Sequence, residues 1–247
     1  MNDVPSDYYA RMHAVEQRHW WHRGMRELEL ALLRPRVRPG ARLLDAGCGT
    51  GGFLRFLLDS GAIGSAAGID VSPEAVALAR ERVPEAELAI ASVTSLPFPD
   101  GSFDAAALND VLQHLPEEDV VTALGELARV LRRGAPLVLR TGASLRARRE
   151  RSDWRTYDRT SLRAELERGG FRCDSVSYAN LAGAAVAELT RRRPVAPAHN
   201  FCGIPTTRPR LVDAVGRALL GAERLVIARA GSTLPFGHTL VAVATRA

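Results

Sequence analysis

The part of this 247-residue chain that is richest in chemical information is a cluster of glycines that follows Asp45. Gly47, Gly49 and Gly52 satisfy the pattern GxGxxG, and Gly47, Gly49 and Gly51 satisfy GxGxG. Glycines let the chain turn tightly from a strand into a helix. They also let a ligand approach the backbone at the helix N-terminus without meeting a Cβ atom. Either pattern alone is also compatible with a simple tight turn, so the neighbouring residues decide what it binds.

Two carboxylates narrow the choice of ligand. Asp45 stands two residues before Gly47, where it suits a cationic or amine-bearing group and would repel a pyrophosphate. Asp70 ends the next apolar run, 23 residues after Gly47, a spacing that suits a carboxylate accepting hydrogen bonds from a ribose diol. The alternative for Asp70 is an acid that caps the helix beginning near Ser72. We therefore predict a pocket for a ribose and a positive or amino-bearing group.

The elements that must position these residues follow from the periodicity of the chain. Short apolar runs alternate with amphipathic segments from residue 41 to residue 142. This alternation predicts a largely parallel sheet with helices on both faces. The predicted strands are 41–47, 65–70, 86–92, 102–110 and 135–142, and the predicted helices between them are 52–62, 73–83 and 117–134.

The flanking segments complete this α/β domain. We predict one long helix over 7–33, a helix over 160–171, a strand over 171–179, a helical segment over 210–230 and a last strand over 238–247. Residues 190–210, rich in Arg, Pro and Thr, read as irregular. The predicted organisation is a helical extension or lid over 1–40 and one domain over 41–247, with a cap or insertion at about 180–230.

The chain has no lysine, so all 33 of its Lys and Arg residues are arginine. With a formal charge of +5, this balance would suit an anionic partner such as nucleic acid. The alternative is the codon bias of a GC-rich genome. We find no nucleic-acid-binding module, so we expect no nucleic-acid partner. We expect the excess arginine on the surface, above all in the runs 146–151 and 191–193.

Cysteine usage and hydropathy exclude further classes of protein. Cys48, Cys173 and Cys202 are widely spaced and form no CxxC pair, which argues against a disulfide framework or a metal site. A reduced, cytoplasmic compartment fits this pattern best. The polar and aromatic start has no apolar signal core, and no run of about 18 apolar residues predicts a membrane span.

Four successive segments carry the most specific pattern in the chain. They are LLDAGCGTGGFLRFL, AAGIDVSPEAVALAR, SLPFPDGSFDAAALNDVLQHLP and GELARVLRRGAPLVLRTG. In order and spacing they resemble the motifs of class I S-adenosylmethionine-dependent methyltransferases, in the type 11 branch that acts on small molecules. The resemblance covers about residues 41–142. It implies a Rossmann-like, doubly wound sheet of seven strands with an antiparallel last strand. It also implies S-adenosylmethionine as cofactor, with S-adenosylhomocysteine as product.

The resemblance also implies roles for individual residues around the glycine cluster. Asp45, Gly47 and Gly49 match the loop that cradles the methionine and ribose portions of the cofactor. Cys48 lies inside that loop as a small residue. Asp70 matches the acid that binds the ribose hydroxyls.

Further positions match the two ends of the cofactor. Val71 would lie against adenine. Ser92 and Val93 stand where many relatives carry an aspartate that bonds the adenine amino group, and the Ser92 hydroxyl or backbone groups would replace it. Asn109, at the end of a predicted strand, would lie near the sulfonium arm. In relatives an arginine near the N-terminus reaches the cofactor carboxylate, and Arg23 or Arg26 would be its match.

Methyl transfer from a sulfonium is an in-line displacement, so the protein must mainly align the nucleophile, methyl and sulfur and exclude water. An O–H or protonated N nucleophile must also lose a proton. His114, just beyond the predicted strand 102–110, is the candidate base, because a neutral imidazole suits that task near pH 7. The alternative is that His114 only shapes its loop.

The aromatic N-terminal segment offers a candidate lid. Tyr9, Trp20 and Trp21 would flank a sulfonium or a planar substrate through cation–π or stacking contacts. The alternative is ordinary packing on the sheet. His13, His19 and His22 in the same segment read as structural residues.

These observations predict a methyltransferase that acts at O or N of a small organic molecule. The long segment 145–235 resembles a substrate cap, which favours secondary metabolism and natural product biosynthesis. We expect a monomer or a homodimer with no metal. The alternatives are a cyclase or a non-methylating binding module on the same scaffold. An NAD-dependent oxidoreductase is disfavoured by Asp45 and the block LPFPDGSFD.

Overall fold

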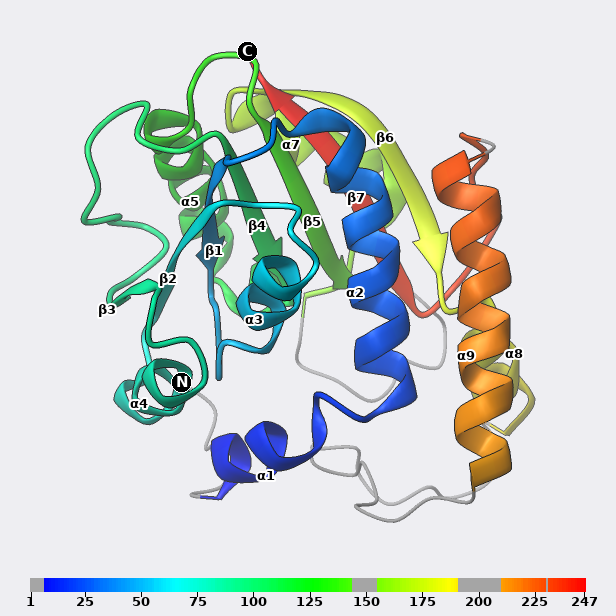
Figure 1. The fold of residues 1–247 in the computed structure, drawn as a ribbon. Coiled ribbons are helices and arrows are strands. Elements are labelled where there is room, and N and C mark those ends of the chain that lie inside the picture. The colour runs from blue at the N-terminus through cyan, green and yellow to red at the C-terminus, as the bar shows by residue number, and fades with distance from the viewer. Residues whose placement is uncertain (1–6, 144–154, 191–209, 230) are drawn as a thin grey trace.

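The computed structural model describes residues 7–143, 155–190, 210–229 and 231–247. Its centre is a seven-stranded sheet in the order β3-β2-β1-β4-β5-β7-β6 (Figure 1). Every strand pair is parallel except β5–β7 and β6–β7, so β7 alone runs against the others. The expected doubly wound sheet with an antiparallel last strand is confirmed. The strands are β1 (Arg42–Ala46), β2 (Ser65–Asp70), β3 (Glu87–Ile90), β4 (Ala105–Asn109), β5 (Pro136–Gly142), β6 (Phe171–Ala179) and β7 (Thr239–Arg246).

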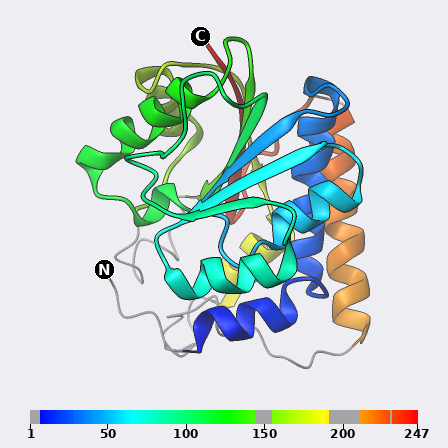
Figure 2. The same ribbon diagram turned by 60° about the vertical axis from the view of Figure 1, so that its left-hand side comes forward.

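Helices cover both faces of the sheet (Figures 1 and 2). On one face α2, α3 and α4 enclose an apolar core with β1 and β4, and on the other face α5 and α7 enclose a larger one. The helices are α1 (Tyr8–Val15), α2 (Trp20–Leu33), α3 (Gly52–Asp59), α4 (Pro73–Arg82), α5 (Glu117–Val130), α7 (Arg159–Arg168), α8 (Leu181–Thr190) and α9 (Arg210–Arg224). Short helical turns are η1 (Arg34–Arg36), η2 (Leu112–His114) and η4 (Leu225–Arg229).

The N-terminal segment is two helices, so the prediction of one helix over 7–33 is wrong. The chain leaves helical geometry before His19, which adopts an extended conformation with ψ of 128°. The Nδ1 atom of His19 accepts a hydrogen bond from the Trp21 backbone N–H at 3.2 Å and so caps α2. Apolar residues continue on both sides of this break, and periodicity therefore could not reveal it.

The helix predicted to reach Gly134 ends earlier. Leu131 turns to an extended conformation with ψ of 147°, and it forms a parallel bridge with Phe103. Pairing with a neighbouring strand segment thus replaces the last helical turn, a competition that local propensity does not show.

The helix α2 is an inner layer of the domain. Its buried side chains pack against β7, and α9 covers its other side. In Figure 1 the two helices run side by side at the edge of the sheet nearest β7. The approach is close because a Cβ atom on Gly216 of α9 would lie 2.5 Å from the ring of Trp20. Trp20 therefore packs in a helix interface, which is the packing alternative considered for it.

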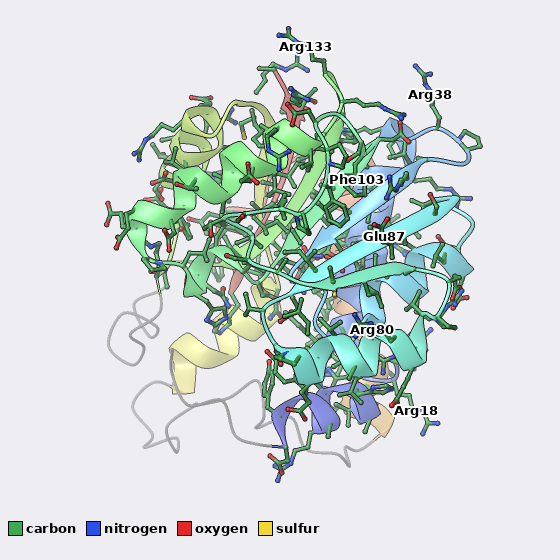
Figure 3. The ribbon with its side chains drawn as sticks, turned by 90° about the vertical axis from the view of Figure 1, so that its left-hand side faces the viewer. Arg18, Arg38, Arg80, Glu87, Phe103 and Arg133 are labelled. Atoms are coloured by element: carbon green, nitrogen blue, oxygen red, sulfur yellow. The ribbon has the colours of Figure 1, made fainter. Side chains whose placement is uncertain are left out.

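Arginine side chains are prominent on the outside of the molecule. Arg18, Arg38 and Arg133 project away from the ribbon in Figure 3, as expected from the composition. The arginine runs 146–151 and 191–193 lie outside the described residues, as does nearly all of the segment predicted to be irregular.

We predict that Gly216→Ala destabilises the fold by about 1–3 kcal/mol, because the added methyl group must displace the Trp20 ring in a packed interface. The control is Gly221→Ala on the same helix, where a Cβ atom has no neighbour within 4 Å. Alanine there improves helix propensity and should leave stability unchanged or slightly higher. Urea unfolding of both variants measures this. Equal stability of the two would contradict the assigned packing.

Candidate functional site

The glycine loop leaves β1 in a conformation that requires glycine. Gly47, Gly49 and Gly51 all have positive φ, with values of 88°, 52° and 76°. The Gly47 N–H donates to the carbonyl of Ile69 at 2.8 Å, which joins the loop to the end of β2. A Cβ atom on Gly47 would collide with the side chain of Val111. The loop is therefore a glycine backbone with side chains packed closely on it, at the carboxyl ends of neighbouring parallel strands.

Asp70 ties this loop to the beginning of α4. Its Oδ2 atom accepts from the Gly49 N–H at 3.0 Å, and its Oδ1 atom accepts from the Ser72 N–H at 3.0 Å. Ser72 in turn caps α4, since its hydroxyl accepts from the Ala75 N–H. Asp70 thus does bond beside the helix start, as in the alternative considered for it. Each carboxylate oxygen can accept more than one hydrogen bond, so this does not exclude ribose binding.

Asp45 is buried at the end of β1, and its Oδ1 atom has no hydrogen-bond partner among the described residues. Burial raises the pKa of Asp45 well above its ordinary value, and the nearby carboxylate of Glu29 raises it further. Buried polar atoms in proteins are almost always hydrogen-bonded. The open acceptor is therefore suited to a donor group supplied by a ligand.

A buried group of charges lies between α2 and the carboxyl ends of β4 and β5. Arg140 donates from Nη1 to Glu29 at 2.6 Å and from Nε to Asp110 at 2.9 Å. Asn109 donates from its side-chain amide to the other oxygen of Glu29 at 3.2 Å, while its own Oδ1 atom is buried without a partner among the described residues. Asp110 has a φ of 58°, which is uncommon for a residue other than glycine and marks a strained turn after β4.

Aromatic residues of α2 lie against this group. The guanidinium of Arg140 lies 5.0 Å from the ring centroid of Trp21, within cation–π range. His22 is buried beside Trp21, and burial together with the charges of Arg26 and Arg140 lowers its pKa well below the ordinary value. His22 is therefore neutral at pH 7, and Trp21 contacts a protein cation.

The corner between α1 and α2 forms a second buried cluster, next to the glycine loop. Arg26 and Arg82 both donate to the carboxylate of Glu16, and the Thr50 hydroxyl donates to it as well. Arg82 also donates to the carbonyl oxygens of Thr50 at 2.9 Å and of His13 at 2.6 Å. Arg26, expected near the cofactor carboxylate, thus lies at the glycine loop with a protein carboxylate as its partner.

The residues expected around adenine are more exposed. Val71 is 62% exposed. Val93 is buried, and the Ser92 hydroxyl pairs with the Thr94 hydroxyl at 2.7 Å. The side chain of Ser92 is thus already used in a local turn. Cys48 is buried, and burial raises the pKa of its thiol, so the thiol is unreactive at neutral pH.

His114 and Tyr9 lie on opposite flanks of these clusters. His114 is exposed at the end of η2, and its Nε2 atom lies 3.4 Å from the side-chain amide of Gln113. Gln113 is buried and accepts from the Gly142 N–H at 2.7 Å, which fixes the loop that carries His114. Tyr9 of α1 lies near Asp70 and shares a hydrogen bond with Ser72, so α1 lies beside the end of β2.

Within residues 7–143, 155–190, 210–229 and 231–247, the structure holds no group of three or more His, Cys, Asp or Glu side chains arranged to bind a metal ion. None of the helices in these ranges has the length and apolar character that crossing a membrane requires.

Known proteins share both the sequence and the fold. The model of a methyltransferase domain family matches residues 44–139. The chain is 31% identical over 197 residues to the demethylmenaquinone methyltransferase of Beutenbergia cavernae, a match that covers 68% of this chain and 79% of that protein. This chain is a class I S-adenosylmethionine-dependent methyltransferase by family. The expected cofactor, S-adenosylmethionine, is confirmed by this membership.

Two solved structures show the same methyltransferase fold. One is a methyltransferase of Haloferax volcanii in complex with the Trm112 methyltransferase activator, with a TM-score of 0.62, 21% identity and 99% coverage of each chain. The other is the 4+2 cyclase SpnF, with a TM-score of 0.61, 22% identity and coverage of 93% of this chain and 84% of that chain. At these identities both show the fold alone.

The matches to other curated relatives cover only part of their length. The chain spans 30%, 32% and 50% of the length of three further curated proteins that it matches.

The residues present fit the cofactor of this methyltransferase family. Asp70 offers acceptor capacity at the edge of the glycine loop, and the open acceptor of Asp45 suits an ammonium group. Exposed Val71 offers an apolar surface for adenine.

Sequence reasoning missed the acid–arginine partners of the site. The sequence patterns do not point to four residues of these clusters, namely Glu16, Glu29, Asp110 and Arg140. They predict that the excess arginine lies on the surface. That expectation is wrong for Arg140, which is 8% exposed, whereas Arg26, a candidate for the cofactor carboxylate, is 5% exposed. The acid at residue 29 lies on the buried side of the amphipathic α2, and this placement was the one signal in the sequence that could have found it.

Glu29 should make stability depend on pH. Burial raises its pKa from 4.5 to about 7, so the folded state holds a proton that the unfolded state has lost between these pH values. Its contribution to the unfolding free energy therefore falls as pH rises from about 4.5 to 7. We predict that Glu29→Gln gains roughly 2–3 kcal/mol relative to the wild type between pH 4.5 and 8.

Urea unfolding at both pH values measures this difference. The control is Glu27→Gln in the same helix, whose carboxylate is 37% exposed and pairs with Arg224. A constant difference between Glu29→Gln and the wild type across this range would contradict the assigned protonation.

Proposed function

We propose that this protein transfers the methyl group of S-adenosylmethionine to a small organic molecule. The observation that carries the proposal is the glycine loop with Asp45 and Asp70 at the carboxyl ends of β1 and β2. Of these strands, β1 lies beside β4, where the strand order of the sheet reverses. Ligands of open α/β sheets bind at such a point.

In this proposal each part of the site holds one part of the cofactor. Asp70 accepts the ribose hydroxyls, Val71 supports adenine, and Asp45 binds the ammonium group. Backbone of the loop at Gly47 and Gly49 lies along the ligand. When bound, the cofactor supplies an activated methyl group, and the protein aligns the acceptor and excludes water.

The acceptor atom in this proposal is an oxygen or a nitrogen that must lose a proton. The protein places proton-accepting side chains where β4 ends, with Asp110 inside the buried group and His114 on the exposed η2. Asp110 is already engaged by two nitrogens of Arg140, at 2.9 and 2.8 Å. This engagement favours His114 as the base. In the same proposal, the acceptor molecule is a product of secondary metabolism.

The cofactor assignment is tested by titration calorimetry with S-adenosylhomocysteine. We expect binding by the wild type. Asp70→Asn should weaken it by about tenfold or more, because hydrogen bonds to a charged carboxylate contribute about 1.5–3 kcal/mol. The control Asp59→Asn changes an exposed acid of α3 that pairs with Arg55. Failure of the wild type to bind would overturn the proposed function.

The base is tested by turnover once an acceptor is known. His114→Ala should lower kcat by about 10²–10⁴-fold near neutral pH and leave the affinity for S-adenosylhomocysteine unchanged. Turnover close to that of the wild type would refute the role of His114. Confirmed ligand binding with no methylated product from any acceptor would instead favour a cyclase or a binding module on this scaffold.

A further inference from the structure

Glu16 is a buried carboxylate that the proposed reaction does not use. It lies at the corner between α1 and α2, and its side chain is 6% exposed. Its Oε1 atom accepts from Thr50 and Arg82, and its Oε2 atom accepts from Arg26. A buried acid with three side-chain donors has no remaining need of solvent, so its geometry is closely fixed.

The cluster has more positive than negative charge. The side chains of Arg26 and Arg82 are 6% and 8% exposed, and Glu16 is the one acid that hydrogen-bonds to them among the described residues. Their other partners are neutral, namely backbone carbonyls and the amide of Gln17. Burial lowers the pKa of each arginine to about 10, which is the effect expected of incompletely compensated cations.

This cluster touches the glycine loop directly. A Cβ atom on Gly52 would collide with the Glu16 carboxylate and with Nη2 of Arg26. The amide of Gln17 donates to the Gly52 carbonyl at 3.4 Å. Met12 of α1 lies over the same loop, since its methyl carbon would be 3.2 Å from a Cβ atom on Gly49. Glu16 therefore joins α1, α2 and α4 at the loop that the cofactor contacts.

Resting on the proposed function, we propose that Glu16 is a positioning residue for the amino-acid end of the cofactor. It holds Arg26 and Arg82 at the glycine loop, so that their excess positive charge is available to the carboxylate of the ligand. Without the charge of Glu16, two buried guanidiniums would repel each other, and Arg82 at the end of α4 would move toward solvent. The anion-binding corner would then be lost, while the adenosine side at Asp70 and Val71 would remain.

Two ligands separate this role from a general effect on folding. S-adenosylhomocysteine carries the amino acid, and 5′-methylthioadenosine has the same adenosine and sulfur without it. In calorimetric titrations of Glu16→Gln we expect the affinity for S-adenosylhomocysteine to fall by about tenfold or more, since charge-assisted contacts are lost. The affinity for 5′-methylthioadenosine should change by less than about threefold. The control is Glu87→Gln, an exposed acid that pairs with Arg42.

A second variant guards against misfolding of the first. Arg82→Gln keeps the Glu16–Arg26 pair and removes one cation, so it should also lower the preference for S-adenosylhomocysteine over 5′-methylthioadenosine. Thermal unfolding of both variants checks that they are folded.

Each remaining outcome is decisive. An equal loss for both ligands would make Glu16 merely structural, and tighter binding of S-adenosylhomocysteine by Glu16→Gln would make it a competitor of the cofactor carboxylate. Either result overturns this inference alone. If the wild type binds neither ligand, the proposed function fails as well.

Discussion

The site depends on the pairing of buried acids with buried arginines at the carboxyl ends of the strands. Glu29 and Asp110 lie there with Arg140 between them, and Asp45 is buried nearby. A single buried charge would be costly, but charges that share hydrogen bonds can be held in fixed positions. The acids can stay buried beside the glycine loop because α2 supplies Glu29 and β5 supplies Arg140.

The need to pair these buried charges explains why α2, in the N-terminal region, packs as part of the domain. One face of α2 provides apolar residues to the core with β7 and α9, and its polar residues Arg26 and Glu29 enter the two charge clusters. In contrast, α1 contributes no buried residue to an apolar core, and it is joined to the loop by polar contacts at its end and by Met12. A lid role for the N-terminal extension is therefore a proposal that suits α1 better than α2.

The structure also shows two different environments for the arginine residues of the chain. Arginine is the sole basic residue besides histidine, and on the surface it projects into solvent, as Arg133 does in Figure 3. At Arg140 the planar guanidinium reaches two acids and the Trp21 ring at once, which the point charge of a lysine could not do. The basic balance that first suggested an anionic partner thus includes residues that neutralise the acids of the protein itself.

By itself, the sequence determined where most of the strands lie along the chain and the position of the glycine loop. Apolar runs, glycines and Ser72 as a helix cap are local signals, and the spacing from Gly47 to Asp70 is set by one strand–helix unit. Tertiary structure alone decided the break before His19, the packing of Trp20 on Gly216, and the partners of Glu16, Glu29 and Arg140. Those features join segments up to 196 residues apart in the chain, as Trp20 and Gly216 are. No local pattern encodes them, because the free energy of a buried charge or a close helix contact depends on what lies across the interface.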